Sequence, residues 1–250
     1  MQVGFKTDKG IYRANNEDAC YVLLPENLYV VADGVGGGNS GEIASRTAVN
    51  EMASYLKSHN LSEAKSKAKI VTFFKNAIDH INDVVYESAK KFEQNTGMAT
   101  TFVSLYMYKG KAYIGNVGDS RVYIYRKGIL QQLTEDHTYV NSLVKAGILT
   151  REQAESDTRK NMITRAIGAE SSVLPDFYMI DMEEGDLFIM CTDGLYDEVS
   201  PKEIISIIKE NDGTMSDLCG SLIRRANQNG GHDNITLICL KVVKEDLNER

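Results

Sequence analysis

Short runs of β-branched and aromatic residues, joined by tight turns, constrain the fold of this chain more than any other feature. The clearest runs are residues 28–32, 100–108, 111–117, 122–126, 187–191 and 235–243, with weaker runs at 3–7 and 20–24. Two junctions, Lys109-Gly110 and Lys127-Gly128, are typical of antiparallel hairpins. Because the runs come in adjacent groups, the sequence predicts antiparallel sheets rather than strand–helix–strand crossovers.

Apolar residues at helical spacing predict four longer helices. The first two, residues 41–57 and 65–92, are consecutive, and their aliphatic and aromatic stripes are assigned to the core. The other two, 201–210 and 215–229, lie near the end, the former with proline in its first turn. Strands and helices grouped in this way predict an α+β fold.

The chain carries no sign of division into domains. Its 250 residues, 42% of them hydrophobic, suffice for one core, and no linker, repeat or low-complexity tract interrupts them. We therefore expect a single domain over residues 1–245 and a short polar tail over 246–250. Residues 135–169 are polar and weakly periodic, which predicts an excursion over the surface with a short helix near 140–146.

Composition excludes several classes of function. No apolar run reaches the roughly 18 residues of a membrane span, and no secretory signal is present, so a cytoplasmic protein without membrane contacts is expected. Four scattered cysteines without a C-x-x-C pair favour buried, free thiols. The net charge of -7 argues against nucleic acid as a partner, and it is also consistent with carboxylates gathered around hard cations.

Aspartates recur at the edges of apolar runs, each beside glycine or asparagine. They are Asp33, Asp119, Asp193 and Asp233. Any single one is explained as an ordinary turn former. Four carboxylates in one place would repel one another, so their recurrence indicates cations, and an all-oxygen ligand set selects magnesium, manganese or calcium rather than zinc.

Arg13 precedes Glu17 and Asp18 in a charged segment. The planar guanidinium matches phosphate oxygens in pairs, so an arginine beside carboxylate-bound metals indicates a phosphate ester as substrate. From composition alone, a surface salt bridge is the commoner role for such an arginine.

Seven motifs together resemble those of a known family. They are R-A-N-N-E-D (13–18), V-A-D-G-V-G-G (31–37), G-M-A-T-T (97–101), G-N-V-G-D-S-R (115–121), N-M-I-T-R-A-I-G (161–168), C-T-D-G-L (191–195) and G-H-D-N-I-T (231–236). In this order they resemble the PPM-type, or type 2C, serine/threonine protein phosphatases, especially the compact bacterial members. Each motif is weak alone, but the set spans almost the whole chain.

The resemblance implies a four-layer α-β-β-α sandwich, in which two antiparallel sheets are flanked by helices. It also implies a dinuclear centre with two Mn²⁺ or Mg²⁺ ions per subunit. By motif, Asp33 would bridge both metals. Asp193 and Asp233 would hold one metal, and Glu17 and the Gly34 carbonyl would hold the other.

The remaining motif positions imply further roles. Asp18 would hold a metal-bound water, Asp119 with Asp193 would support a third, weaker ion, and Arg13 would bind the substrate phosphate. Residues 139–165 correspond to the family's mobile flap. Phosphoserine and phosphothreonine would be hydrolysed by direct attack of a hydroxide that bridges the metals. The implied partners are phosphorylated proteins, including a bacterial serine/threonine kinase and its substrates, and a monomer is expected.

The sequence departs from the family at the general acid. Many eukaryotic members have histidine two residues after the bridging aspartate, where this chain has Val35. Bacterial relatives often have histidine further on, where this chain has Gly38. His137 and His232 are the remaining histidines near motifs, and each is more often structural. The source of the leaving-group proton therefore stays open, with metal-bound water as a further candidate.

Two other classes of function are weighed against the phosphatase. Residues 36–41 spell G-x-G-x-x-G, a dinucleotide-binding pattern, but the helix that follows leads into a second helix instead of a parallel strand. The other alternative is a catalytically silent or specialised partner-switching regulator of the same fold. It is disfavoured because every carboxylate that the motifs require is present.

Overall fold

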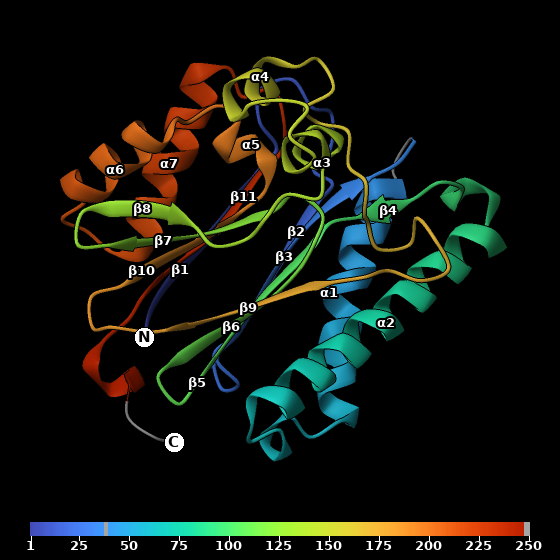
Figure 1. Ribbon diagram of the computed structural model, residues 1–250, viewed down its shortest axis with the longest axis horizontal. Coiled ribbons are helices and arrows are strands. Elements are labelled where there is room, and N and C mark those ends of the chain that lie inside the picture. Colours follow the sequence, from blue (N-terminus) through green and yellow to red (C-terminus); the bar gives the residue numbers. More distant parts are fainter. Residues whose placement is uncertain (38–39, 248–250) are drawn as a thin grey trace.

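The computed structural model describes residues 1–37 and 40–247 and contains two antiparallel sheets packed face to face (Figure 1). The first sheet has the order β1 (Gln2–Asp8), β11 (Ile235–Lys241), β10 (Leu187–Cys191), β7 (Arg121–Arg126) and β8 (Ile129–Gln132). The second has the order β2 (Asp18–Leu23), β3 (Leu28–Val35), β5 (Phe102–Tyr108), β6 (Lys111–Val117) and β9 (Asp176–Asp181), and β4 (Ala99–Thr100) pairs with the end of β3.

Two pairs of helices cover the outer faces of the sheets (Figure 1). Helices α1 (Ser40–Ser58) and α2 (Lys67–Lys91) pack on the second sheet, whereas α6 (Pro201–Glu210) and α7 (Met215–Asn229) pack on the first. Capping boxes at Ser200 and Thr214 satisfy the first backbone donors of α6 and α7. The α-β-β-α order of layers that the resemblance implied is confirmed.

Three apolar layers fill the sandwich, and β3 contributes to two of them. Leu28, Val30 and Ala32 pack against α1 and α2, whereas Tyr29 and Val31 pack between the sheets. This alternation explains why β3 is continuously apolar, since both of its faces are buried. The third layer lies between the first sheet and α6 and α7.

Several elements differ from those that the sequence predicted. The run at 28–32 continues to Val35, so β3 includes Asp33, and the run at 100–108 is interrupted at Thr101. The excursion contains the expected helix, α3 (Tyr139–Lys145), and an unexpected second one, α4 (Arg151–Ser156). Strands β8 and β9 were not predicted, because β8 has four residues and β9 is a half-exposed edge strand with aspartate at both ends.

The four cysteines are free, as their spacing in the sequence predicted. Cys191, Cys219 and Cys239 are buried free thiols, whereas Cys20 is a half-buried one. Within the described residues, every helix is too short or too polar to cross a membrane.

Gly4 on β1 shows how closely the first sheet packs against α7. A β-carbon on Gly4 would lie 2.2 Å from the carbonyl carbon of Met215, at the start of that helix. We expect Gly4→Ala to lower the free energy of unfolding by about 1–3 kcal/mol, because strand or helix must shift to accommodate the methyl group. Urea denaturation measures the change. Gly37→Ala is the control, because no atom counted from the described residues lies within 4 Å of the added carbon. Equal stabilities of the two variants would contradict the packing argument.

Candidate metal centre

The register of β2 and β3 places two aspartates opposite each other. Asp18, the first residue of β2, pairs with Asp33 near the end of β3. Asp33 continues the alternation of Tyr29 and Val31, and therefore belongs to the face of β3 that is turned toward the other sheet. Like charges directly opposite each other destabilise a sheet, so this pair calls for a compensating cation.

The other predicted aspartates lie at the same end of the sandwich. Asp119 lies where the chain crosses from β6 in one sheet to β7 in the other. Asp193 begins the short helix α5 (Asp193–Tyr196), two residues after the end of β10, and Asp233 lies two residues before the start of β11. Since Cys191 at the end of β10 pairs with both Arg121 and Leu237, these three turns are neighbours.

Threonines hold the Asp18–Asp33 pair in place. The Asp33 amide donates to Thr101 Oγ1 at 2.9 Å, and the Thr100 hydroxyl donates to the Asp33 carbonyl at 2.8 Å. Across the two sheets, the Thr192 hydroxyl donates to Asp18 Oδ2 at 2.9 Å. The motifs A-T-T and C-T-D-G contain these threonines, but the sequence analysis assigned them no role.

Glycines beside two of the aspartates allow close backbone packing. A β-carbon on Gly34 would lie 2.0 Å from the Gly41 carbonyl oxygen, and one on Gly194 would lie 2.0 Å from that of Asn234. The former contact places the start of α1 directly against β3. This packing, together with antiparallel sheets, accounts for the described part of the glycine-rich stretch and leaves no parallel strand for dinucleotide binding.

Asn234 secures the loop between β1 and β2 that carries Arg13 and Glu17. Its side-chain oxygen accepts from the Glu17 amide at 2.8 Å, and its side-chain nitrogen donates to the carbonyls of Lys9 and Asn15 at 2.9 and 3.0 Å. Asn234 belongs to the motif G-H-D-N-I-T, in which no role was predicted for it. An asparagine directly after a ligand-type aspartate was the available signal.

Arg13 makes a salt bridge to a candidate metal ligand. Its NH2 atom lies 2.6 Å from Asp233 Oδ2, and its Nε donates to the His232 carbonyl at 3.3 Å. The Arg13 side chain remains 48% exposed. The salt bridge that composition favoured is therefore formed, and it also brings the guanidinium to the carboxylate cluster.

Burial disfavours the charged form of these carboxylates. It raises the pKa of Asp18 and of Asp119 to about 8, and nearby Asp193 adds to both shifts. Burial also raises the pKa of Asp33 well above its ordinary value, with further contributions from Asp18, Asp193, Asp119 and Asp233. These electrostatic interactions show that the predicted aspartates form one cluster.

Two carboxylate oxygens of the cluster lack a hydrogen-bond donor. Asp18 Oδ1 and Asp193 Oδ1 are buried and have no hydrogen-bond partner. A buried acceptor without a donor is costly, and a hard cation is the species that oxygen ligands without histidine or thiolate bind. The donor set thus fits a divalent cation such as Mn²⁺ or Mg²⁺.

The carboxylates do not form a ready coordination shell as they lie. Within residues 1–37 and 40–247, no three histidine, cysteine, aspartate or glutamate side chains are close enough to constitute a metal-binding group. Asp233 instead makes an ion pair with Arg13. Side-chain rotation at these residues is therefore needed before a cation is enclosed.

The histidines differ in their environment. His137 is buried, its Nδ1 accepts from the Gly118 amide at 3.1 Å, and its Nε2 lies 3.2 Å from Asp176 Oδ2. Burial lowers the pKa of His137, and both of its nitrogens are engaged, so its role is structural. His232 is exposed. Val35 ends β3 and is partly exposed, whereas Gly38 lies outside the described residues.

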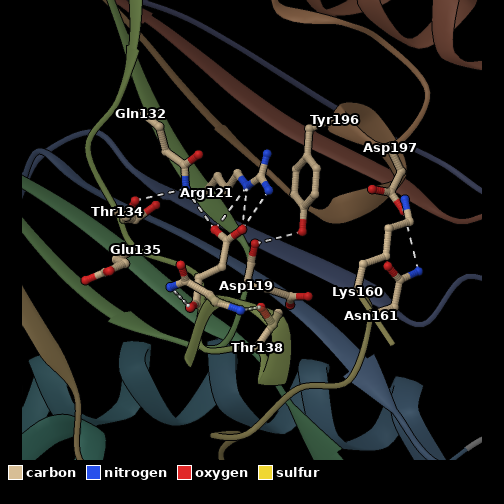
Figure 2. A network of polar contacts seen from close by, with 12 residues as sticks. Asp119, Arg121, Gln132, Thr134, Glu135, Thr138, Lys160, Asn161, Tyr196 and Asp197 are labelled. Atoms are coloured by element: carbon tan, nitrogen blue, oxygen red, sulfur yellow. Dashed lines mark hydrogen bonds and ion pairs between the residues drawn. The ribbon is translucent and has the colours of Figure 1, made fainter. Parts of the chain in front are cut away.

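A polar network connects Asp119 to Arg121 and Tyr196 (Figure 2). The Arg121 guanidinium makes a bidentate ion pair with Asp136 and lies 3.4 Å from the centre of the Tyr196 ring. The Tyr196 hydroxyl donates to the Asp119 carbonyl at 3.0 Å. Sequence reasoning missed Tyr196, whose place in α5, three residues after Asp193, becomes evident only in the fold.

The proposed flap contacts this network at both of its ends. Near its start, Asn141 donates to the Asp136 carbonyl at 2.7 Å. Near its end, Lys160 lies 2.9 Å from Asp197, the residue after α5 (Figure 2). The segment is thus attached to the turn that carries Asp193.

Comparisons with known proteins identify the family. The model of the family described as "Protein phosphatase 2C" matches residues 12–236. The chain is 34% identical to serine/threonine phosphatase stp of Listeria monocytogenes, over 100% of this chain and 98% of that protein. It is also 34% identical to protein phosphatase PhpP of Streptococcus pneumoniae, over 98% and 99%.

Solved structures agree with these relatives. The serine/threonine phosphatase of S. agalactiae superposes with a TM-score of 0.89 at 35% identity, covering 96% of this chain and 99% of that one. The catalytic domain of the phosphatase PstP, in complex with two manganese ions, superposes with a TM-score of 0.83 at 30% identity, covering 97% and 98%. The two-sheet sandwich is that of a PPM-type phosphatase. The chain belongs to the protein phosphatase 2C family.

The raised carboxyl pKa values predict how stability depends on pH in a chelator. Between the ordinary aspartate pKa of about 4 and the folded value of about 8, the folded chain binds more protons than the unfolded chain. The free energy of unfolding should therefore fall as the pH rises from about 5 to about 8. Urea denaturation in EDTA across this range tests it.

Two comparisons sharpen the test of this pH dependence. Asp18→Asn removes one of the titrating groups and should reduce the slope, and added Mn²⁺ should stabilise the chain most at the upper end of the range. A flat profile, or a slope that Asp18→Asn leaves unchanged, would contradict the electrostatic cluster.

Proposed function

We propose that this chain hydrolyses phosphoserine and phosphothreonine monoesters of other proteins at a dinuclear Mn²⁺ or Mg²⁺ centre. The chain is a metal-dependent protein serine/threonine phosphatase by its family. The observation that carries the site assignment is the buried cluster around the opposed pair Asp18 and Asp33, with unpartnered oxygens on Asp18 and Asp193. The two manganese ions bound to PstP support the same assignment.

The cluster divides naturally between two cations. Asp18, Asp193, Asp119 and Asp233 all raise the pKa of Asp33, which suits a ligand shared by both ions. Asp193 and Asp233, which interact with each other and both belong to the first sheet's end, would hold one ion. Glu17 and the Gly34 carbonyl would hold the other, and the Gly34 amide donates to the Glu17 carbonyl at 3.1 Å.

Asp18 and Asp119 would act at the edge of this centre. Asp18 faces the space between the sheets beside Asp33 and would bind through a water molecule. Asp119 interacts with Asp193, and with it would support a third, weaker ion. Because Tyr196 and Arg121 hold the turn that carries Asp119, they would orient this carboxylate.

The chemistry of the reaction follows from charge. Two bound divalent cations would lower the pKa of a water molecule and stabilise negative charge on the transferring phosphoryl group. Arg13 would bind the phosphate oxygens and orient the ester, since its guanidinium already lies at the cluster. The thiols of Cys20 and Cys191 are poor nucleophiles, because burial raises their pKa values to about 11 and 12, and Cys219 and Cys239 are buried.

The physiological setting follows from the relatives. Proteins named serine/threonine phosphatase stp and protein phosphatase PhpP are bacterial. We infer a bacterial, cytoplasmic monomer that acts on phosphorylated proteins, among them a serine/threonine kinase and its substrates. A catalytically silent regulator is disfavoured, because the carboxylates that bind metal are retained.

The direct test is hydrolysis of a phosphothreonine peptide by metal-stripped protein before and after addition of Mn²⁺. Activity that requires metal and persists with a cysteine-directed inhibitor would support the proposal. A folded protein that stays inactive with every divalent metal would favour the silent regulator instead.

Asp193→Ala should lower the turnover number by at least about a hundredfold, because it removes a metal ligand at the reaction centre. The fold should be retained, since the change removes no core volume and relieves carboxylate repulsion. Peptide hydrolysis and thermal unfolding measure the two effects. Asp83→Ala, at an exposed position on α2, is the matched control; normal turnover of Asp193→Ala would contradict the dinuclear assignment.

Arg13→Ala should raise the Michaelis constant for phosphate monoesters about tenfold and lower the turnover number less, because it removes a phosphate-binding group. Arg13→Lys keeps the charge but loses the planar fork, so it should restore only part of the affinity. Since Arg13 also contacts Asp233, calorimetric Mn²⁺ binding must be measured in parallel. An unchanged Michaelis constant would remove Arg13 from the phosphate site.

A further inference from the structure

Two apolar residues immediately before Arg13 are unusually exposed. Ile11 is 60% exposed and Tyr12 is 70% exposed, which is the largest value for any large hydrophobic residue in the described chain. Neither residue belongs to a strand or a helix, and neither is needed to fill a core layer. An exposed aromatic beside a functional side chain calls for an explanation beyond packing.

The Tyr12 ring is held in a defined position. It stacks on the His232 ring with a centroid distance of 5.2 Å and an interplanar angle of 9°. The His232 Nδ1 lies 2.6 Å from Glu198 Oε1, and the Glu198 side chain is only 12% exposed. A largely buried carboxylate therefore fixes the imidazole, and the imidazole supports the tyrosine.

Two glycines allow this arrangement. The Ile11 amide donates to the Gly231 carbonyl at 2.8 Å, and a β-carbon on Gly231 would lie 2.7 Å from Ile11 Cγ1. A β-carbon on Gly230 would lie 2.3 Å from His232 Cε1. Any larger residue at either position would displace the side chains that it approaches. The positions of Ile11 and His232 therefore depend on these two glycines.

The stacked pair is continuous with the phosphate site. Arg13 follows Tyr12 directly, and its Nε donates to the His232 carbonyl. A phosphorylated polypeptide whose phosphate reaches Arg13 must place its neighbouring residues on the surface around that arginine. Ile11, Tyr12 and the His232 ring offer an apolar, preformed surface there.

We propose that Ile11, Tyr12 and His232 form a shelf that binds an apolar residue next to the phosphorylated residue of the protein substrate. This inference rests on the proposed function and deepens it, because it gives the phosphatase a preference for sequence around the phosphate. Aromatic rings supply large contact area with little loss of side-chain freedom, which suits recognition of a flexible peptide.

The test compares three substrates with the full chain in Mn²⁺. One is a phosphothreonine peptide with leucine on both sides of the phosphothreonine, the second has glycine at those positions, and the third is a small aryl phosphate. For the unmodified chain, kcat/KM should be higher for the leucine peptide than for the glycine peptide. In Tyr12→Ala, the ratio of kcat/KM for the leucine peptide to that for the aryl phosphate should fall about tenfold.

Matched variants separate recognition from a general effect on the loop. Tyr12→Phe keeps the ring and should keep the leucine preference. Ile11→Ala should weaken that preference, whereas Ile129→Ala, which removes an equally exposed isoleucine (68%) at the hairpin of β7 and β8 away from the aspartates, should not. Thermal unfolding of each variant checks that the fold is retained.

The outcomes distinguish failure of the proposed shelf from failure of the proposed phosphatase function. A loss that is equal for all three substrates, or no loss in Tyr12→Ala, would overturn the shelf while the phosphatase assignment stands. Absence of metal-dependent hydrolysis of all three substrates by the unmodified chain would overturn the proposed function and the shelf with it.

Discussion

The burial of several carboxylates at one end of a rigid sandwich is the constraint on which the rest of this structure depends. Asp18 and Asp33 face each other across two paired strands, and their neighbours raise the pKa of each further. Strands held between packed layers cannot move apart to relieve this repulsion. The fold therefore maintains an arrangement that is unfavourable without cations, which supports the proposal that this end of the sandwich binds them.

Neither sheet contains the site alone. Asp18 and Asp33 come from the second sheet, Asp193 and Asp233 follow or precede strands of the first, and Asp119 lies where the chain crosses between them. The hydrogen bond from Thr192 to Asp18 joins the two sheets directly at this point. Correct packing of the apolar layer between the sheets is consequently a condition for forming the centre.

The sequence predicted the parts of the fold that follow from periodicity, and the candidate ligands that follow from repeated local patterns. Asp33 and Asp193 could be found because each ends an apolar run and precedes glycine. The supporting contacts of Asn234 and Tyr196 could not be predicted from the sequence, because they join segments that are tens or hundreds of residues apart in the chain. Strand β9 escaped prediction because an exposed edge strand needs little apolar alternation.

The segment proposed as a flap is electrostatically coupled to the carboxylate cluster. Lys160 neutralises Asp197, and the charge of Asp197 is one of the causes that raise the pKa of Asp193. Asn161 contacts the same carboxylate. The proposed flap is therefore tied by polar contacts to the residue that follows α5, the helix that begins at Asp193.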